Sequence, residues 1–262
     1  MKQIVCIIAF LIGFTKSIAQ TTAFTVKRNS GQITQIHQQK SNIIFAIDAT
    51  KGEILNVYIF DDIKMANQFM NNGDKRFLPL EEVPLGQHSN VSVLINSYKA
   101  IEYAKNYSNY SRAGIVGAII KIDNYAFDYH LRIGDNSKIG IVGKLKKVGT
   151  HNITYQKNYS SYVRDGIAGK LATLGTTKFE YYERDNFSEM ANYVGKISKV
   201  GNIAVKFNKP YSRTEYKAGK VEAIGNFKFE YYINTYQNVS MGVTGKFESI
   251  SGTDNRVKIW FR

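Results

Sequence analysis

The chain has 262 residues, of which 44% are hydrophobic and 21% are charged, and these proportions exclude a disordered protein. With 35 Lys and Arg against 21 Asp and Glu, the net charge is +14, so the surface is expected to attract anionic polymers or lipid headgroups. The 18 Tyr, 15 Phe and 21 Gly, set against 3 Pro, favour β-structure with tight turns.

Residues 1–19 are predicted to be a secretory signal peptide. Lys2 provides the positive start, and the apolar run 4–14 is too short for an ordinary membrane-spanning helix. Ser17-Ile18-Ala19 provides the small residues of a cleavage site. The sequence therefore predicts an exported chain that begins at Gln20.

The mature chain would contain no cysteine, because Cys6 lies in the leader. It could form no disulfide and no cysteine metal site, which fits a bacterial envelope. Without Lys2 and Lys16, 33 basic and 21 acidic residues leave a charge of +12. We expect a periplasmic protein, or one associated with the cell surface or outer membrane of a Gram-negative bacterium.

Residues 20–90 are predicted to be an irregular β segment. Asn42–Asp48 and Glu53–Phe60 have the composition of strands around a Thr50-Lys51-Gly52 turn. Phe69–Phe77 is interpreted as a degenerate hairpin, and Glu81–Gly86 as a loop at the boundary with the next region.

Residues 91–262 contain an internal repeat, which is the most specific pattern in the sequence. Five Gly-Lys pairs, Gly143-Lys144, Gly169-Lys170, Gly195-Lys196, Gly219-Lys220 and Gly245-Lys246, recur at intervals of 26, 26, 24 and 26 residues. Gly117 and Val91 begin two further copies at the same spacing, which makes seven. We name each copy by its first residue.

Each copy is predicted to be a β-hairpin. Folding 219–231 about a three-residue loop, Ile224-Gly225-Asn226, pairs Val221 with Phe229 on an apolar face and Lys220 with Glu230 on a charged face. A two-residue loop would mix the two faces, so strict alternation excludes it. The same alignment favours a hairpin over a helix for Ile95–Tyr107.

The predicted fold is therefore all-β: an antiparallel meander of about seven hairpin repeats of ~26 residues, curled or folded back to bury one apolar face. An aromatic residue stands twelve residues after the start of each of six copies, and burial of this row is expected to stabilise the core. The row consists of Tyr103, Tyr129, Tyr155, Tyr181, Phe207 and Tyr231.

Two sets of side chains are candidate binding residues. The lysines at the second position of the copies would recur about every 10 Å across a continuous sheet and could follow an anionic glycan, or form a solvated face. They are Lys144, Lys170, Lys196, Lys220 and Lys246. Tyrosines cluster where successive hairpins reconnect, and they could stack on sugars or cap the sheet edge. They are Tyr159, Tyr162, Tyr182, Tyr211, Tyr216, Tyr232 and Tyr236, among which Tyr182 and Tyr232 are the strongest candidates.

No pattern of catalytic residues is recognisable, and neither a metal site nor a cofactor is predicted. The four histidines have no metal-ligand spacing, and the Gly-Lys pairs lack the other residues of a phosphate-binding loop. Nucleic acid is not an expected partner, because the chain is exported and its basic residues are mostly Lys.

The repeat unit, read in Gly219–Tyr232 as Gly-Lys-h-x-x-h-Gly-Asn followed by Phe-x-Tyr-Tyr, resembles that of uncharacterised secreted β-hairpin-repeat proteins of Bacteroidota-type bacteria. The resemblance covers about 91–262 and implies no activity. We expect a non-enzymatic secreted or periplasmic envelope protein, a structural or binding module whose partner is an anionic envelope polymer or another envelope protein. The alternatives are an outer-membrane β-barrel protein and an exported hydrolase with an unrecognised site.

Overall fold

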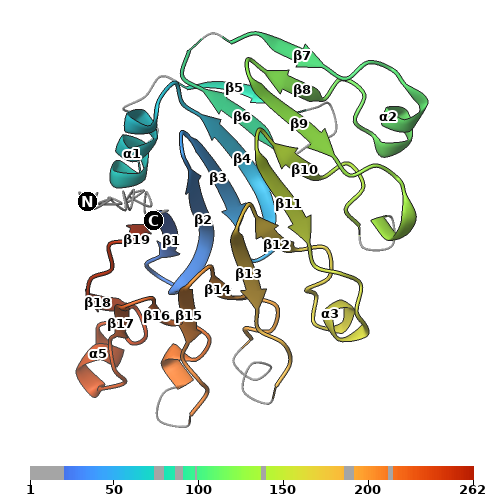
Figure 1. Cartoon of the computed structure of the whole chain (residues 1–262). Helices are drawn as coiled ribbons and strands as arrows, with labels where there is room; N and C mark the ends of the chain where they lie inside the picture. The colour runs from blue at the N-terminus through green and yellow to red at the C-terminus, as the bar shows by residue number, and fades with distance from the viewer. Residues whose placement is uncertain are drawn as a thin grey trace, which may run out of the picture.

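The computed structural model describes residues 21–73, 80–85, 91–97, 99–136, 140–185, 192–211 and 215–262. Within these ranges the chain forms two β-sheets with one hydrophobic core between them (Figure 1). The predicted signal peptide and Cys6 lie outside the described residues.

The larger sheet is an antiparallel meander of twelve strands in sequence order, from β18 at one edge to β7 at the other. Its strands are β7 (Ile101–Tyr103), β8 (Ile119–Ile122), β9 (Tyr125–Tyr129), β10 (Leu145–Val148), β11 (His151–Tyr155), β12 (Leu171–Leu174), β13 (Thr177–Tyr181), β14 (Ile197–Val200), β15 (Ile203–Phe207), β16 (Val221–Ile224), β17 (Phe227–Tyr231) and β18 (Phe247–Ser251). The predicted all-β antiparallel meander is confirmed.

Five of the seven copies form complete hairpins among the described strands, from β8–β9 to β16–β17. The first and the last copies are divided between the two sheets. β6 (Ser92–Ile95) and β19 (Val257–Phe261) belong to the smaller sheet, so β7 and β18 each lack the hairpin partner that the repeat predicts.

The predicted three-residue hairpin loop is wrong. Ile224 pairs with Phe227, which leaves a two-residue loop at Gly225-Asn226. The faces remain separate because Glu222 is an extra residue: Val221 pairs with Phe207, and Ala223 pairs with Lys206. Such a β-bulge lets Val221 and Ile224, three positions apart, both face the core.

The smaller sheet has seven strands in the order β19-β1-β2-β3-β4-β6-β5. β1 is Thr22–Lys27, β2 is Gln32–Lys40, β3 is Ile43–Asp48, β4 is Glu53–Ile59 and β5 is Glu81–Pro84. β19 is parallel to β1 and β6 is parallel to β4, whereas the other neighbouring pairs are antiparallel. The predicted strands around the Thr50-Lys51-Gly52 turn are confirmed as β3 and β4.

This smaller sheet covers the apolar face of the meander, and both of its own faces are buried. Phe45 and Val57 pack into the core between the sheets, whereas their neighbours Ile44 and Tyr58 pack on the opposite face. The helix α1 (Ile63–Asn72) covers that opposite face. The meander therefore buries its face under a second sheet made by the flanking segments.

Two predictions for the region before residue 91 are wrong. The helix α1 occupies the first part of the predicted degenerate hairpin Phe69–Phe77, of which 74–77 lie outside the described residues. Asp62 caps it by accepting a hydrogen bond from the Met65 amide, and Gly73 ends it with φ 64°. The predicted loop Glu81–Gly86 contains strand β5, while Gly86 is not among the described residues.

Loops at one edge of the meander connect the hairpins and contain short helices (Figure 1). These are α2 (Ser108–Ala113), α3 (Ser160–Arg164), α5 (Tyr236–Ser240) and the 3₁₀ turns η2 (Gly134–Asn136) and η3 (Glu215–Lys217). None of the helices within the described ranges is both long and apolar enough to cross a membrane.

Candidate functional site

Each connecting loop is closed at its base by the first two residues of the next copy, a step that is Gly-Lys in five copies and Gly117-Ala118 in another. In the Gly195 copy, the Gly195 amide donates to the Tyr182 carbonyl, and the Tyr182 amide donates to the Lys196 carbonyl. Gly195 has φ 72°, and a Cβ there would lie 2.7 Å from the Asp165 carbonyl oxygen. Glycine is thus required by conformation and by space, and the step fixes the backbone of the lysine that follows.

The repeated lysines lie over the aromatic row. Lys144, Lys170, Lys196 and Lys220 each place Nζ 5.3–5.4 Å from the ring centroid of the aromatic residue in their own copy. All four are half-buried, and only Lys246, in the last copy, is exposed. The lysines are therefore not a uniform outer row, and Lys220 contacts Tyr231 rather than the predicted Glu230.

Three of these lysines use their ammonium groups to join neighbouring segments. Lys144 donates to Glu53 at 2.8 Å and to the Gly169 carbonyl at 3.2 Å. Lys170 donates to the Thr50 and Gly195 carbonyls, both at 2.6 Å. Lys220 donates to the Gly245 carbonyl. These contacts connect each copy to the next.

Turns of the smaller sheet dock on two of the copies in the same way. On the Gly169 copy, the Leu171 amide donates to the Gly52 carbonyl, and the Leu171 carbonyl accepts from the Tyr181 hydroxyl at 2.9 Å. On the Gly219 copy, the Val221 amide donates to the Gly31 carbonyl, and the Val221 carbonyl accepts from the Tyr231 hydroxyl at 2.8 Å.

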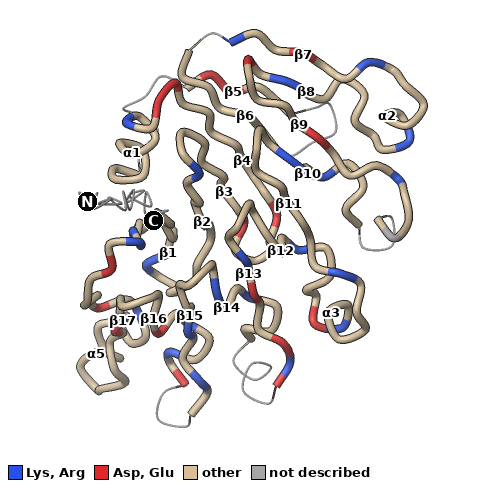
Figure 2. Tube along the Cα trace, viewed as in Figure 1, with Lys and Arg blue, Asp and Glu red and all other residues tan. Residues whose placement is uncertain are grey.

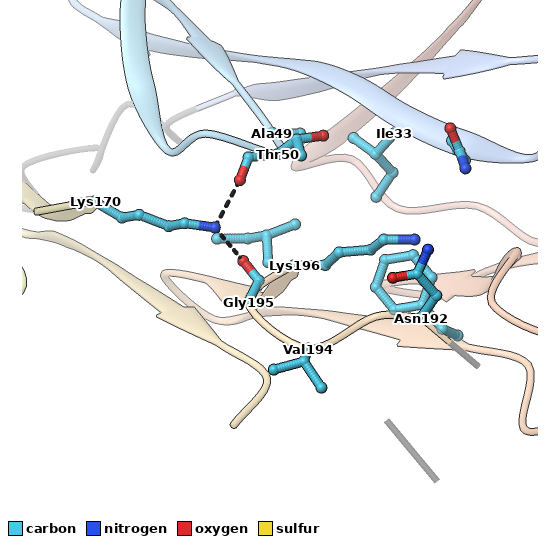
Figure 3. Close-up of a pocket in the computed structure, with 11 residues that line it drawn as sticks. Ile33, Ala49, Thr50, Lys170, Asn192, Val194, Gly195 and Lys196 are labelled. Atoms are coloured by element: carbon cyan, nitrogen blue, oxygen red, sulfur yellow. Dashed lines mark hydrogen bonds between the residues drawn. The ribbon is translucent and has the colours of Figure 1, made fainter. Parts of the chain in front are cut away.

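A cavity of about 260 Å³ lies between these docked turns, at the Gly195 copy. Its polar side chains include Lys196, Gln32 and Asn192, and its apolar walls include Ile33 and Phe207. Figure 3 shows Lys196 extending towards Asn192, while Lys170 is held by Thr50 and Gly195.

Lys196 differs from its equivalents in what surrounds its ammonium group. Among the residues that the structure describes, no hydrogen-bond acceptor or carboxylate pairs with it, and its contact is the face of Phe207. Burial lowers the pKa of Lys196. The site therefore combines a cavity with a partly desolvated cation and two side-chain amides, a set of donors suited to an anion.

A second cavity, of about 400 Å³, lies at the Gly143 copy. It is lined by Lys144, Glu53, Tyr129 and Tyr155, among other residues. Here Glu53 already neutralises Lys144, and the two tyrosine hydroxyls donate to backbone carbonyls of Ile119 and Leu145. These three polar side chains and the Lys144 ammonium are thus satisfied from within the chain.

The two candidate tyrosines are both half-buried at the bases of loops. Tyr182 donates to the Val205 carbonyl at 2.8 Å, and burial raises its pKa to about 12, so its hydroxyl is a structural donor. Tyr232 bonds through its backbone to Lys246 and Gly245.

The connecting loops expose apolar side chains to solvent. They include Tyr107, Ile133, Tyr159, Val163, Tyr211, Ile233, Tyr236, Val239 and Met241, which are 54–92% exposed. Among the tyrosines where hairpins reconnect, Tyr159, Tyr211 and Tyr236 are exposed, whereas Tyr162 and Tyr216 are half-buried. The loop edge therefore presents aromatic and aliphatic groups to solvent, some of them in contact with a second ring, as Tyr159 is with Tyr162.

Basic and acidic residues are interspersed over the chain trace rather than gathered in a stripe of one sign (Figure 2). On the outer face of the meander, Lys121 pairs with Glu102 at 2.8 Å. Within the described ranges, His, Cys, Asp and Glu form no group of three or more that could hold a metal ion.

Comparison of the chain with known protein families, with curated proteins and with solved structures found no match.

Of the five candidate lysines, Lys196 is the one that lines a cavity without a hydrogen-bond acceptor among the residues that the structure describes. The sequence did not indicate Gln32, Ile33 or Asn192, because they come from the β1–β2 turn region and from a loop. One signal was present: Phe207 is the single Phe in a row of tyrosines.

Proposed function

We propose that the mature chain is an exported, non-enzymatic binding module of a bacterial cell envelope, and that it binds an acidic sugar of an envelope glycan at Lys196. The observation that carries this proposal is the half-buried Lys196 ammonium, which faces a cavity. At Lys144, Lys170 and Lys220 the equivalent group has an acceptor from the chain itself.

The chemistry of the cavity suits a sugar acid. A carboxylate would give Lys196 the charge-assisted partner that no described residue provides, and such bonds are the strong ones in proteins. The amides of Gln32 and Asn192 can donate to and accept from hydroxyl groups. The ring of Phe207 holds the Lys196 ammonium at the cavity by a cation–π contact. Ile33 adds an apolar wall for the C–H side of a sugar. At about 260 Å³, the cavity is just below the ~300–1,000 Å³ of typical ligand pockets, which suits one sugar unit.

Two further features support a polymer rather than a free monosaccharide. The charge of +12 expected for the mature chain would concentrate an anionic polymer near the surface. Tyr211, on the loop that follows Phe207, is 54% exposed and can stack on neighbouring sugars. The chain would thus hold one acidic unit and contact its neighbours along the loop edge.

The expected location agrees with this ligand, because acidic glycans are components of the bacterial surface that an exported protein meets. The expected location is inferred from the predicted signal peptide, and cell fractionation tests it directly. Fractionation of the producing cells is expected to recover the processed chain, starting near Gln20, in the periplasm or at the cell surface.

The binding experiment uses the full mature chain and defined probes: glucuronate, galacturonate, an oligogalacturonide and, as a neutral control, glucose. Calorimetry is expected to detect binding of the acids and not of glucose. Lys196→Met should weaken binding at least about tenfold, because a charge-assisted bond contributes roughly 1.5–3 kcal/mol.

Lys178→Met is the control, because Lys178 has the same charge and is exposed on the outer face of the interior strand β13, outside the cavity. It should leave affinity within about twofold of the parent, since loss of one exposed charge changes only the screened field. Equal weakening by both substitutions would reduce the site to a general charge effect. Absence of binding to every acidic probe would contradict the proposal.

A further inference from the structure

We infer that the meander continues from one chain into the next. β18 of one chain and β7 of a second, identical chain would form the hairpin that neither chain completes alone. The inference starts from the divided copies. β18 is the first strand of the Gly245 copy, and β7 is the second strand of the Val91 copy. Among the described strands, nothing pairs with the outer edge of either one.

The missing halves match. In a complete copy, the residues at positions four and five after the starting Gly pair with those at nine and eight, as Ala223 does with Lys228 and Ile224 with Phe227. The same register across two chains would pair Ser249 of one chain with Ala100 of the second chain. Both of these residues are exposed.

The side chains that lock a complete copy are also present and unused at the two edges. Within the Gly219 copy, the Lys220 ammonium lies over the ring of Tyr231. The Tyr231 hydroxyl donates to the carbonyl of Val221, two residues after the starting glycine. The corresponding groups of the composite copy are Lys246, the carbonyl of Phe247, and Tyr103 of the second chain.

Tyr103 is 49% exposed, whereas the other five members of the aromatic row are 2–9% exposed. Lys246 is exposed as well, and no described residue supplies it with a side-chain partner. One edge thus offers the cation and the carbonyl, and the other edge offers the ring and the hydroxyl. Two different complementary edges generate a head-to-tail contact, which extends into a filament or closes into a ring.

The first measurement is the mass of the mature chain in solution as a function of concentration. We expect species larger than one chain, with association weakened about tenfold in Tyr103→Ser and in Lys246→Ser, from loss of the cation–π contact and the hydrogen bond. A chain that stays monomeric at millimolar concentration would overturn the inference.

Engineered cysteines test the pairing itself, since the mature chain would contain no other thiol. Ser249→Cys and Ala100→Cys chains, mixed under mild oxidation, should form the mixed disulfide dimer. The control partner for Ser249→Cys is Thr154→Cys, because Thr154 is exposed on the interior strand β11, and this mixture should not cross-link. Preferential 249–249 or 100–100 dimers would also overturn the inference. The acidic-sugar titrations are independent, because Lys196 lies away from both edges.

Discussion

The Gly169 and Gly195 copies have the same repeat pattern but opposite surroundings. On the Gly169 copy, the β3–β4 turn docks through the Gly52 carbonyl, and Lys170 donates to Thr50 in that turn. On the Gly195 copy, a cavity of about 260 Å³ lies at the equivalent face, and its lysine has no such acceptor among the described residues.

The difference shows that segments of the smaller sheet dock on every second copy of the meander. The Leu85 carbonyl accepts a hydrogen bond from an amide of the Gly117 copy. The Gly52 carbonyl accepts one from the Gly169 copy, and the Gly31 carbonyl accepts one from the Gly219 copy. The two cavities described above lie at the intervening copies, Gly143 and Gly195. A repeat of identical hairpins thus acquires distinct positions through contacts with a sheet that does not share its period.

The largest effect on stability is expected from a substitution that disrupts docking of the β3–β4 turn on the Gly169 copy. Gly52→Ala would place a Cβ 2.6 Å from the Tyr181 hydroxyl and 2.7 Å from the Lys170 side chain, at φ 63°. Backbone strain and overpacking together should lower the free energy of unfolding by about 3 kcal/mol. Urea denaturation measures the change.

Gly166→Ala is the control, because Gly166 also has a positive φ, 65°, but a Cβ there would meet nothing within 4 Å. It should cost only about 1 kcal/mol, the conformational part. Equal losses in the two variants would mean that the close approach of the turn to Tyr181 contributes nothing to stability.

The meander could be predicted from the sequence because its repeat, its turn residues and its alternating faces all agree. The register could not be predicted from alternation, since Glu222 and its equivalents add one bulged residue to each hairpin. The h-x-x-h spacing of Val221 and Ile224 was the sign of that bulge.

The smaller sheet was harder to predict for a different reason. β3 is buried on both faces, so its sequence is continuously apolar and does not show which face meets which layer. The diversion of β6 and β19 out of the repeat depends on contacts between distant segments. The candidate site has the same origin, because Gln32 and Lys196 meet only when the two sheets pack.

A smaller effect compares the aromatic residues of the docked and undocked copies. Tyr181→Phe removes the donor to the buried Leu171 carbonyl and should cost about 1–2 kcal/mol of unfolding free energy. Phe207→Tyr is the reciprocal change, since Phe207 is ten residues after Ile197, as Tyr181 is after Leu171. It should be neutral or slightly stabilising. A loss as large as that of Tyr181→Phe would refute the equivalence of the two positions.

The smallest effect concerns the two lysines. Lys170→Met removes the donor to two carbonyls and should destabilise the chain, whereas Lys196→Met removes an ammonium group that has no acceptor within the described part of the chain. Because methionine preserves much of the packed length, Lys196→Met should raise the free energy of unfolding at pH 7 by up to about 1 kcal/mol.

The pH dependence separates this cause from a packing effect. Burial lowers the pKa of Lys196 below its usual 10.5, so in the interval between the two values the unfolded chain binds more protons than the folded chain. The stability of the parent protein therefore gains from this group as pH rises towards 10.5, and the Met variant lacks that gain. The advantage of Lys196→Met should shrink as the pH rises from 7 towards 10.5, as measured by urea denaturation of both proteins. An advantage that is constant with pH would assign it to packing, and the cavity would then lose the uncompensated charge on which its contrast with the Gly169 copy depends.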